Sequence, residues 1–238
     1  MKDSNSDHLI KFAAICSILG AITTALLLFL PRPTAADFES QLLLHDNSLY
    51  LARLWILFLH PQVNFIASLG IAYVLVRRFP ARIIFGTFFL LVWAYTEMSQ
   101  QSLLIDGLNQ IWRPAYLAAQ ESADQNIYRT LITGTAGYSD SQYFLVIYGF
   151  GLGSLCYGLA FLSLGNWAKW LGGALVFIGL LSLASFSRYY LGMNWLNWVV
   201  DSSYSYIYPY LQPLVRIGLG VWLWRVSTGS ISKLQNLA

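Results

Sequence analysis

The sequence has few charged residues for its length. Only 11% of the 238 residues are Asp, Glu, Lys or Arg, whereas a soluble domain has about 25%. Hydrophobic residues make up 57% of the chain, and the mean hydropathy is +0.54. A soluble protein of this size cannot bury so much apolar surface, and the same composition excludes disordered and collagen-like chains. We therefore predict an integral membrane protein.

Cysteine and histidine are also scarce, with two and three residues. Cys16 and Cys156 both fall in apolar stretches, so we interpret them as small buried side chains rather than as a disulfide. The sequence has no CxxC, CxxCH or HExxH spacing, and it therefore predicts no metal site. The net charge of +3 is too small and too scattered to indicate nucleic-acid binding.

Six apolar stretches are long enough to cross the hydrocarbon core as helices, which takes about 20 residues. They cover residues 9–30, 50–76, 83–105, 141–164, 169–192 and 209–226. The first could be a signal peptide, but its apolar run from Phe12 to Leu30 is longer than the usual signal core. We therefore predict an all-α fold, a single bundle of six transmembrane helices that retains its first helix.

Charges of opposite sign fall on opposite sides of these spans. The side of the N-terminus holds most of the basic residues, namely Lys2, Lys11, Arg77, Arg78, Arg82, Lys169, Arg225 and Lys233. The other side holds most of the acidic ones, namely Asp37, Glu39, Asp46, Asp106, Glu121, Asp124, Asp140 and Asp201. The positive-inside rule therefore predicts that both termini are cytoplasmic.

The connections on the outer side are the longer ones, near 31–49, 106–140 and 193–208. Pro114 suits the first turn of a helix, and apolar residues follow it at spacings of three or four as far as Leu131. This pattern predicts an amphipathic interfacial helix on the outer surface.

Asp37 is expected to cap a short helix that continues to Leu44. Alternate tyrosines predict an extended segment in an aromatic belt: Tyr204, Tyr206, Tyr208 and Tyr210.

The fourth span carries glycines at intervals that allow another helix to approach closely. Gly149 and Gly153 are four residues apart, and Gly158 lies four residues after Ser154. This face is a candidate contact for a membrane-protein partner or a second copy of the chain. Membrane lipids are the other expected partners.

Ionisable groups are expensive at membrane depth, so each one is a functional hypothesis. His60 lies about 15 Å and Glu97 about 12 Å from the outer ends of their helices, at 1.5 Å of rise per residue. The other ionisable side chains within the predicted spans, such as Arg188 and Arg216, are also in the outer half of the membrane. The candidate ligand-binding residues are Glu97, His60, Gln101, Arg188, Arg216 and Tyr189.

This clustering predicts a polar cavity that opens to the outer side. Because an unpaired carboxylate is untenable in hydrocarbon, Glu97 needs a cation or a proton, and Arg188 and Arg216 are candidate partners. The alternative roles are structural. Arg188 can extend to the surface, Glu97 and Arg216 can form an ion pair that fixes helix register, and His60 can be hydrogen-bonded at a kink before Pro61.

Several classes of membrane enzyme need motifs that the sequence lacks. It has no GxSxG elbow, no Walker lysine and no histidine-rich motif, so we name no catalytic residue and no cofactor. We expect a protein that binds or senses a small or lipid-like ligand, or that is a subunit of a membrane complex. A small secondary transporter and an enzyme acting on a lipid or quinone are the alternatives.

Some features resemble a known group of bacterial membrane proteins. They are the size, the six spans, the stretch Gly86…Trp93…Glu97, and the ending Tyr208-Pro209…Gly220-Val221-Trp222-Leu223-Trp224. Together they resemble the domain-of-unknown-function 4386 group. The resemblance implies a multi-pass protein of the bacterial inner membrane, and it brings no activity, cofactor or site residue.

Overall fold

The computed structural model describes residues 4–165 and 167–229, and no strand occurs among them. Its long helices are α1 (Ser4–Phe29), α3 (Ser48–Leu75), α4 (Pro80–Ser102), α6 (Ser122–Leu162), α7 (Ala168–Leu191) and α9 (Tyr208–Ser227). Each of them contains most of one predicted apolar stretch. The all-α prediction is confirmed.

Five helical segments are long and apolar enough to cross a membrane. α9 is not among them, because its 20 residues include Arg216 and Arg225 and are less apolar. The continuous helical stretch Pro80–Ala118 has 39 residues and α6 has 41. Both are about twice as long as the 20 residues that cross the hydrocarbon core. These lengths and compositions are those of a membrane protein.

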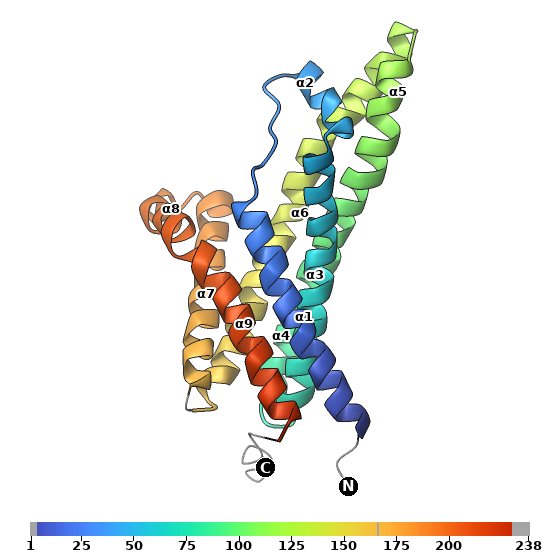
Figure 1. Ribbon diagram of the computed structural model, residues 1–238. Helices are drawn as coiled ribbons and strands as arrows, with labels where there is room; N and C mark the ends of the chain where they lie inside the picture. The colour runs from blue at the N-terminus through green and yellow to red at the C-terminus, as the bar shows by residue number, and fades with distance from the viewer. Residues whose placement is uncertain (1–3, 166, 230–238) are drawn as a thin grey trace.

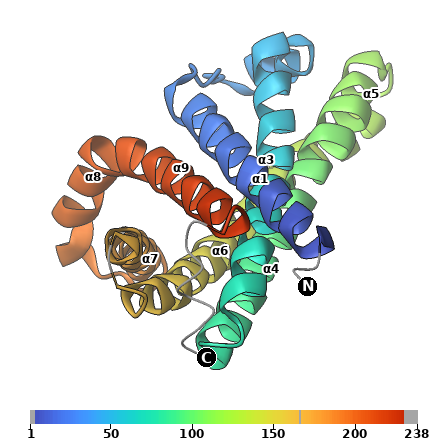
Figure 2. The same ribbon diagram turned by 60° about the horizontal axis from the view of Figure 1, so that its bottom comes forward.

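The six long helices form a ring. α1 packs on α3, α3 on α4, α4 on α6 and α6 on α7, and α9 closes the ring between α1 and α7 (Figure 2). The contact of α9 with α1 is extensive, whereas the contact between α7 and α9 is the weakest around the ring. The short helix α8 (Asn197–Tyr206) contacts both α7 and α9 at one end of this seam. The space inside the ring is where a site can form.

The two ends of the ring differ in their connections (Figure 1). At one end, here called the turn end, α1 starts, α9 finishes, and tight turns join α3 to α4 and α6 to α7. Basic side chains join the helices there. Arg82 donates hydrogen bonds to the Leu159 carbonyl and the Ser163 hydroxyl, each at 2.9 Å, and Arg225 stacks over the Trp167 ring. Lys2 and Lys233, assigned to this end from the sequence, lie outside the described residues.

The opposite end, here called the loop end, contains a long helical hairpin. From α4 the chain continues through a π-helix, η2 (Leu103–Trp112), into the short helix α5 (Arg113–Ala118). It then turns at residues 119–121, and α6 runs without interruption back into the ring. α5 and the start of α6 extend beyond the other helices (Figure 1).

The predicted amphipathic surface helix from Pro114 to Leu131 is therefore wrong. The helix beginning near Pro114 ends at Ala118, and Leu131 belongs to α6. The Gln125 amide donates to the Ala119 carbonyl at 2.9 Å, which satisfies the end of α5 at the turn. On the α6 side of the turn the apolar residues of this spacing are exposed, with Ile127 at 58% and Leu131 at 39%.

The predicted cap at Asp37 is confirmed. Its carboxylate accepts a hydrogen bond from the Ser40 N–H at 2.7 Å and begins α2 (Phe38–Leu42), which continues as a 3₁₀ turn, η1 (Leu43–Asp46). A further hydrogen bond from the Ser40 hydroxyl is the main reason why the pKa of Asp37 lies below its ordinary value.

The extended segment predicted from the alternate tyrosines is wrong. Tyr204 and Tyr206 belong to α8, and Tyr208 and Tyr210 belong to α9. Tyr204 near the end of α8 and Tyr208 at the start of α9 lie close together, with their ring centroids 4.9 Å apart. Tyr206 and Tyr210 are 77% and 61% exposed, so the four rings do not share one face.

The glycines of α6 allow helices on both sides to approach closely. A Cβ on Gly153 would lie 2.6 Å from Leu90 Cγ of α4, and one on Gly149 would lie 2.8 Å from an α4 carbonyl oxygen. A Cβ on Gly158 would lie 2.7 Å from the Val176 nitrogen of α7. The close helix approach predicted at these glycines is made by helices of the same chain.

We predict that Gly153→Leu destabilises the bundle and that Gly173→Leu does not. A side chain at Gly153 overlaps α4, and overpacking of this kind costs about 1–3 kcal/mol. Gly173 is exposed on α7, with nothing within 4 Å of an added Cβ. Thermal unfolding of the two purified variants in the same detergent measures the difference. Equal midpoints would contradict the assigned packing of α4 on α6.

Candidate functional site

The ring encloses a cavity of about 340 Å³ toward the loop end, here called the outer cavity. Its wall includes residues from α1, α3, α4, α6, α7, α8 and α9. Leu28 and Tyr143 belong to this wall and are 37% and 49% exposed, so the cavity reaches the surface of the protein. Its polar lining residues are Thr24, His60, Glu97, Ser182 and Gln212, with two tyrosines beside Tyr143.

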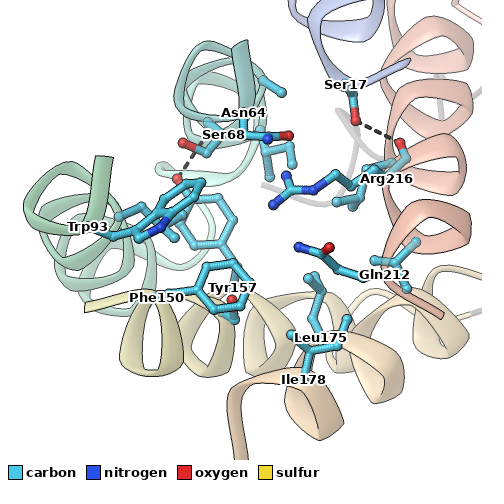
Figure 3. Close-up of a pocket in the computed structure, with 16 residues that line it drawn as sticks. Ser17, Asn64, Ser68, Trp93, Phe150, Tyr157, Leu175, Ile178, Gln212 and Arg216 are labelled. Carbon is cyan, nitrogen blue, oxygen red and sulfur yellow. Dashed lines mark hydrogen bonds between the residues drawn. The ribbon is translucent and has the colours of Figure 1, made fainter. Parts of the chain in front are cut away.

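A second cavity, here called the inner cavity, has a volume of about 50 Å³. Trp93, Phe150 and Gln212 line both cavities, so the two adjoin each other. The Arg216 guanidinium points into the inner cavity between Asn64 and Gln212 (Figure 3). The Ser17 hydroxyl donates to the Arg216 carbonyl at 2.7 Å, which attaches α9 to α1 beside the cavity.

The ring is closed between these cavities and the turn end. Phe161, Trp222 and Leu223 are at most 1% exposed there. The Phe161 and Trp222 rings meet edge to face with centroids 4.9 Å apart. This apolar packing separates both cavities from the basic turn end.

His60 lies on the wall of the outer cavity with polar side chains beside both of its ring nitrogens. The Thr23 hydroxyl lies 2.9 Å from Nδ1 and donates to the Gly20 carbonyl, so it accepts the proton of Nδ1. The Asn64 amide nitrogen donates to the His60 carbonyl at 2.8 Å and lies 3.1 Å from Nδ1 and 3.2 Å from Nε2. Both ring nitrogens therefore have polar neighbours within the protein. His60 therefore joins α1 to α3.

Glu97 lies on the same wall with much less support. Its carboxylate accepts a hydrogen bond from the Trp93 side chain, one turn earlier on α4. Glu97 belongs to none of the ion pairs in the described part of the chain. The sequence suggests Arg188 or Arg216 as its partner, and neither forms an ion pair with it here.

The other predicted site residues lie elsewhere. Arg188 forms an ion pair with Asp201 of α8 at the loop end, and Tyr189 is 59% exposed. Gln101 is 5% exposed and belongs to neither cavity. Of the six candidates, Glu97 and His60 therefore share the outer cavity, Arg216 lines the adjoining inner cavity, and the remaining three contribute to neither wall.

The structure adds residues that the sequence does not single out. Gln212 is 5% exposed and lines both cavities, and its side chain forms no hydrogen bond among the described residues. It lies four residues before Arg216, on the same face of α9, and this spacing is the signal that could have found it. No sequence spacing indicates Ser182. Its place on the cavity wall depends on how α7 packs on α6.

Comparison of the chain with protein-family models, with curated proteins and with solved structures gave no match. The resemblance to a group of bacterial membrane proteins stays a prediction. The functional argument therefore depends on the geometry of the two cavities.

We predict that Arg188 is energetically coupled to Asp201 and not to Glu97. Double-mutant cycles on unfolding free energy, with Arg188→Gln combined with Asp201→Asn or with Glu97→Gln, measure this coupling. The first cycle should give about 0.2–1 kcal/mol, because the pair is partly exposed. The second cycle should be additive. Coupling in the second cycle alone would show that Arg188 reaches Glu97.

Proposed function

We propose that the protein spans the membrane six times with both termini in the cytoplasm, and that its outer cavity binds a small or lipid-like ligand. α9 is the sixth span, because it completes the ring beside α1. Its two arginines reduce its hydropathy, but Arg216 faces the inner cavity rather than lipid. The cytoplasmic membrane of a bacterium is the proposed location.

The charge distribution supports this orientation. Arg77, Arg78 and Arg82 lie at or next to the α3–α4 turn, and Lys169 lies beside the α6–α7 turn. Arg225 belongs to the last turn of α9, at the same end. Positive charge next to the spans marks the cytoplasmic side. The outer cavity then faces away from the cytoplasm.

Glu97 is the observation on which the ligand-binding proposal depends. A carboxylate on the wall of a cavity within a ring of apolar helices needs a partner, since an uncompensated charge there is expensive. Trp93 supplies one hydrogen bond, and no cation of the described chain is paired with Glu97. A ligand in the 340 Å³ cavity supplies the missing partner.

Two features favour binding or sensing over the alternatives. Transport needs a path to the other side of the membrane, and the Phe161–Trp222 packing closes the turn end. Acid–base chemistry with His60 needs a ring nitrogen that faces a substrate, and both ring nitrogens already lie 2.9–3.2 Å from the side chains of Thr23 or Asn64. Glu97 and His60 are also not hydrogen-bonded to each other.

The orientation is tested by cysteine labelling in intact cells. Cys16 and Cys156 are replaced by alanine, and single cysteines are placed at Gln120 or at Lys169, both exposed. A membrane-impermeant maleimide should label Gln120→Cys in intact cells and Lys169→Cys only after lysis. The reverse pattern would overturn the topology.

Ligand binding is tested by native mass spectrometry of gently solubilised protein. The wild type should retain a bound species that Glu97→Gln loses, because the neutral amide cannot balance a positive charge. Glu121→Gln is the matched control, since Glu121 is exposed at the α5–α6 turn. If Glu97→Gln lowers thermal stability but retains the same bound mass as the wild type, Glu97 is structural and the proposal fails.

A further inference from the structure

Aromatic rings make up a large part of the wall of the outer cavity. On one side, Trp93 of α4 and Phe150 of α6 have ring centroids 5.3 Å apart. On another side, Tyr204 of α8 and Tyr208 of α9 have centroids 4.9 Å apart. Tyr143 of α6 adds a fifth ring where the cavity reaches the surface. Five rings from four helices therefore face one enclosed space.

The rings are fixed in position by neighbouring groups. The Trp93 side chain donates to Glu97, and the Tyr204 hydroxyl is hydrogen-bonded to Ser185 and Ser182 of α7. The Ser182 hydroxyl in turn donates to the Ile147 carbonyl at 3.0 Å. The tyrosine pair therefore joins α8 and α9 to α7 across the weakest seam of the ring.

We propose that the outer cavity binds a quaternary ammonium group, with Glu97 as its counter-charge and the aromatic rings around its methyl groups. This inference rests on the proposed ligand-binding function and names the chemical class of the ligand. The face of an aromatic ring is electrostatically negative and attracts a cation within about 6 Å of its centroid. A quaternary ammonium group needs no hydrogen-bond acceptor, which matches a wall in which rings and aliphatic side chains outnumber the polar ones.

The two arginines near the cavity are placed differently. Arg188 is neutralised by Asp201 at the loop end. Arg216 lines the adjoining inner cavity (Figure 3), where its Nε has no hydrogen-bond partner in the described part of the chain, and Gln212 lines both cavities. Glu97 is the only Asp, Glu, Lys or Arg among the described residues that line the outer cavity.

The test compares two probes of nearly equal shape. Choline carries a trimethylammonium group, and 3,3-dimethyl-1-butanol replaces its nitrogen by carbon and has no charge. Isothermal titration of the purified wild type in a non-ionic detergent should give an affinity for choline at least about 10-fold higher than for the alcohol. Equal affinities would show an apolar cavity without charge recognition and would overturn the inference.

Variants separate the carboxylate from the rings. Glu97→Gln should weaken choline binding about 10-fold or more and leave the weak binding of the alcohol unchanged. Tyr143→Leu should weaken choline binding about 3- to 10-fold, and Tyr143→Phe should retain it, because the ring rather than the hydroxyl is used. Tyr138→Leu, on α6 outside both cavities, is the matched control. Loss of choline binding in Tyr138→Leu as large as in Tyr143→Leu would contradict the assigned site.

A final comparison identifies the source of the ammonium group. Thermal unfolding is measured in nanodiscs of phosphatidylcholine and of phosphatidylglycerol, each with and without choline. Greater stability in phosphatidylcholine, lost in Glu97→Gln, indicates a lipid headgroup, whereas stabilisation by choline in both lipids indicates a free ligand. Stabilisation in neither arm overturns the quaternary ammonium inference. A bound species of another class, found by native mass spectrometry, would leave the ligand-binding function standing.

Discussion

Every charge within a bundle of apolar helices has to be compensated by the protein or by something that it binds, and Arg53 and Arg188 show two ways in which the protein does so. Arg53 donates to the Leu27 and Leu30 carbonyls, which are free at the end of α1. Arg188 pairs with Asp201. Arg216 faces the inner cavity. Glu97 has only the Trp93 hydrogen bond, which makes it the least compensated charge of the outer cavity.

The packing of the ring explains why space remains beside Glu97. Glycines bring α4, α6 and α7 close together, and the contact between α1 and α9 is also extensive. α7 and α9 meet less closely, and at the loop end α8 and its tyrosine pair fill the distance between them. Tight contacts on most of the ring and one wider seam leave a cavity along the central axis. The large aromatic residues at the turn end close that axis.

Much of this arrangement follows from the sequence, and the remainder depends on how the helices pack. Apolar stretches located all six long helices, and the Asp37 cap follows from local chemistry. The depth of Glu97 and of His60 follows from the number of residues between each of them and the outer end of its helix. These two depths were enough to place both residues in the same part of the bundle. Depth could not show that Arg188 turns outward to Asp201, because the rotation of α7 is set by its neighbours. The hairpin at Ala119 was missed because apolar residues continue at spacings of three or four on both sides of the turn.

Access from the outer side to the cavity is the central claim, and thiol labelling of its wall tests it most directly. Ser182→Cys, in a background without other cysteines, places a thiol in the outer cavity, and Ser227→Cys places one that is equally buried at the turn end. A small charged methanethiosulfonate added to intact cells should modify Ser182→Cys and not Ser227→Cys. Protection of Ser182→Cys from the outside, in a protein that is correctly inserted, would contradict an outward-facing cavity.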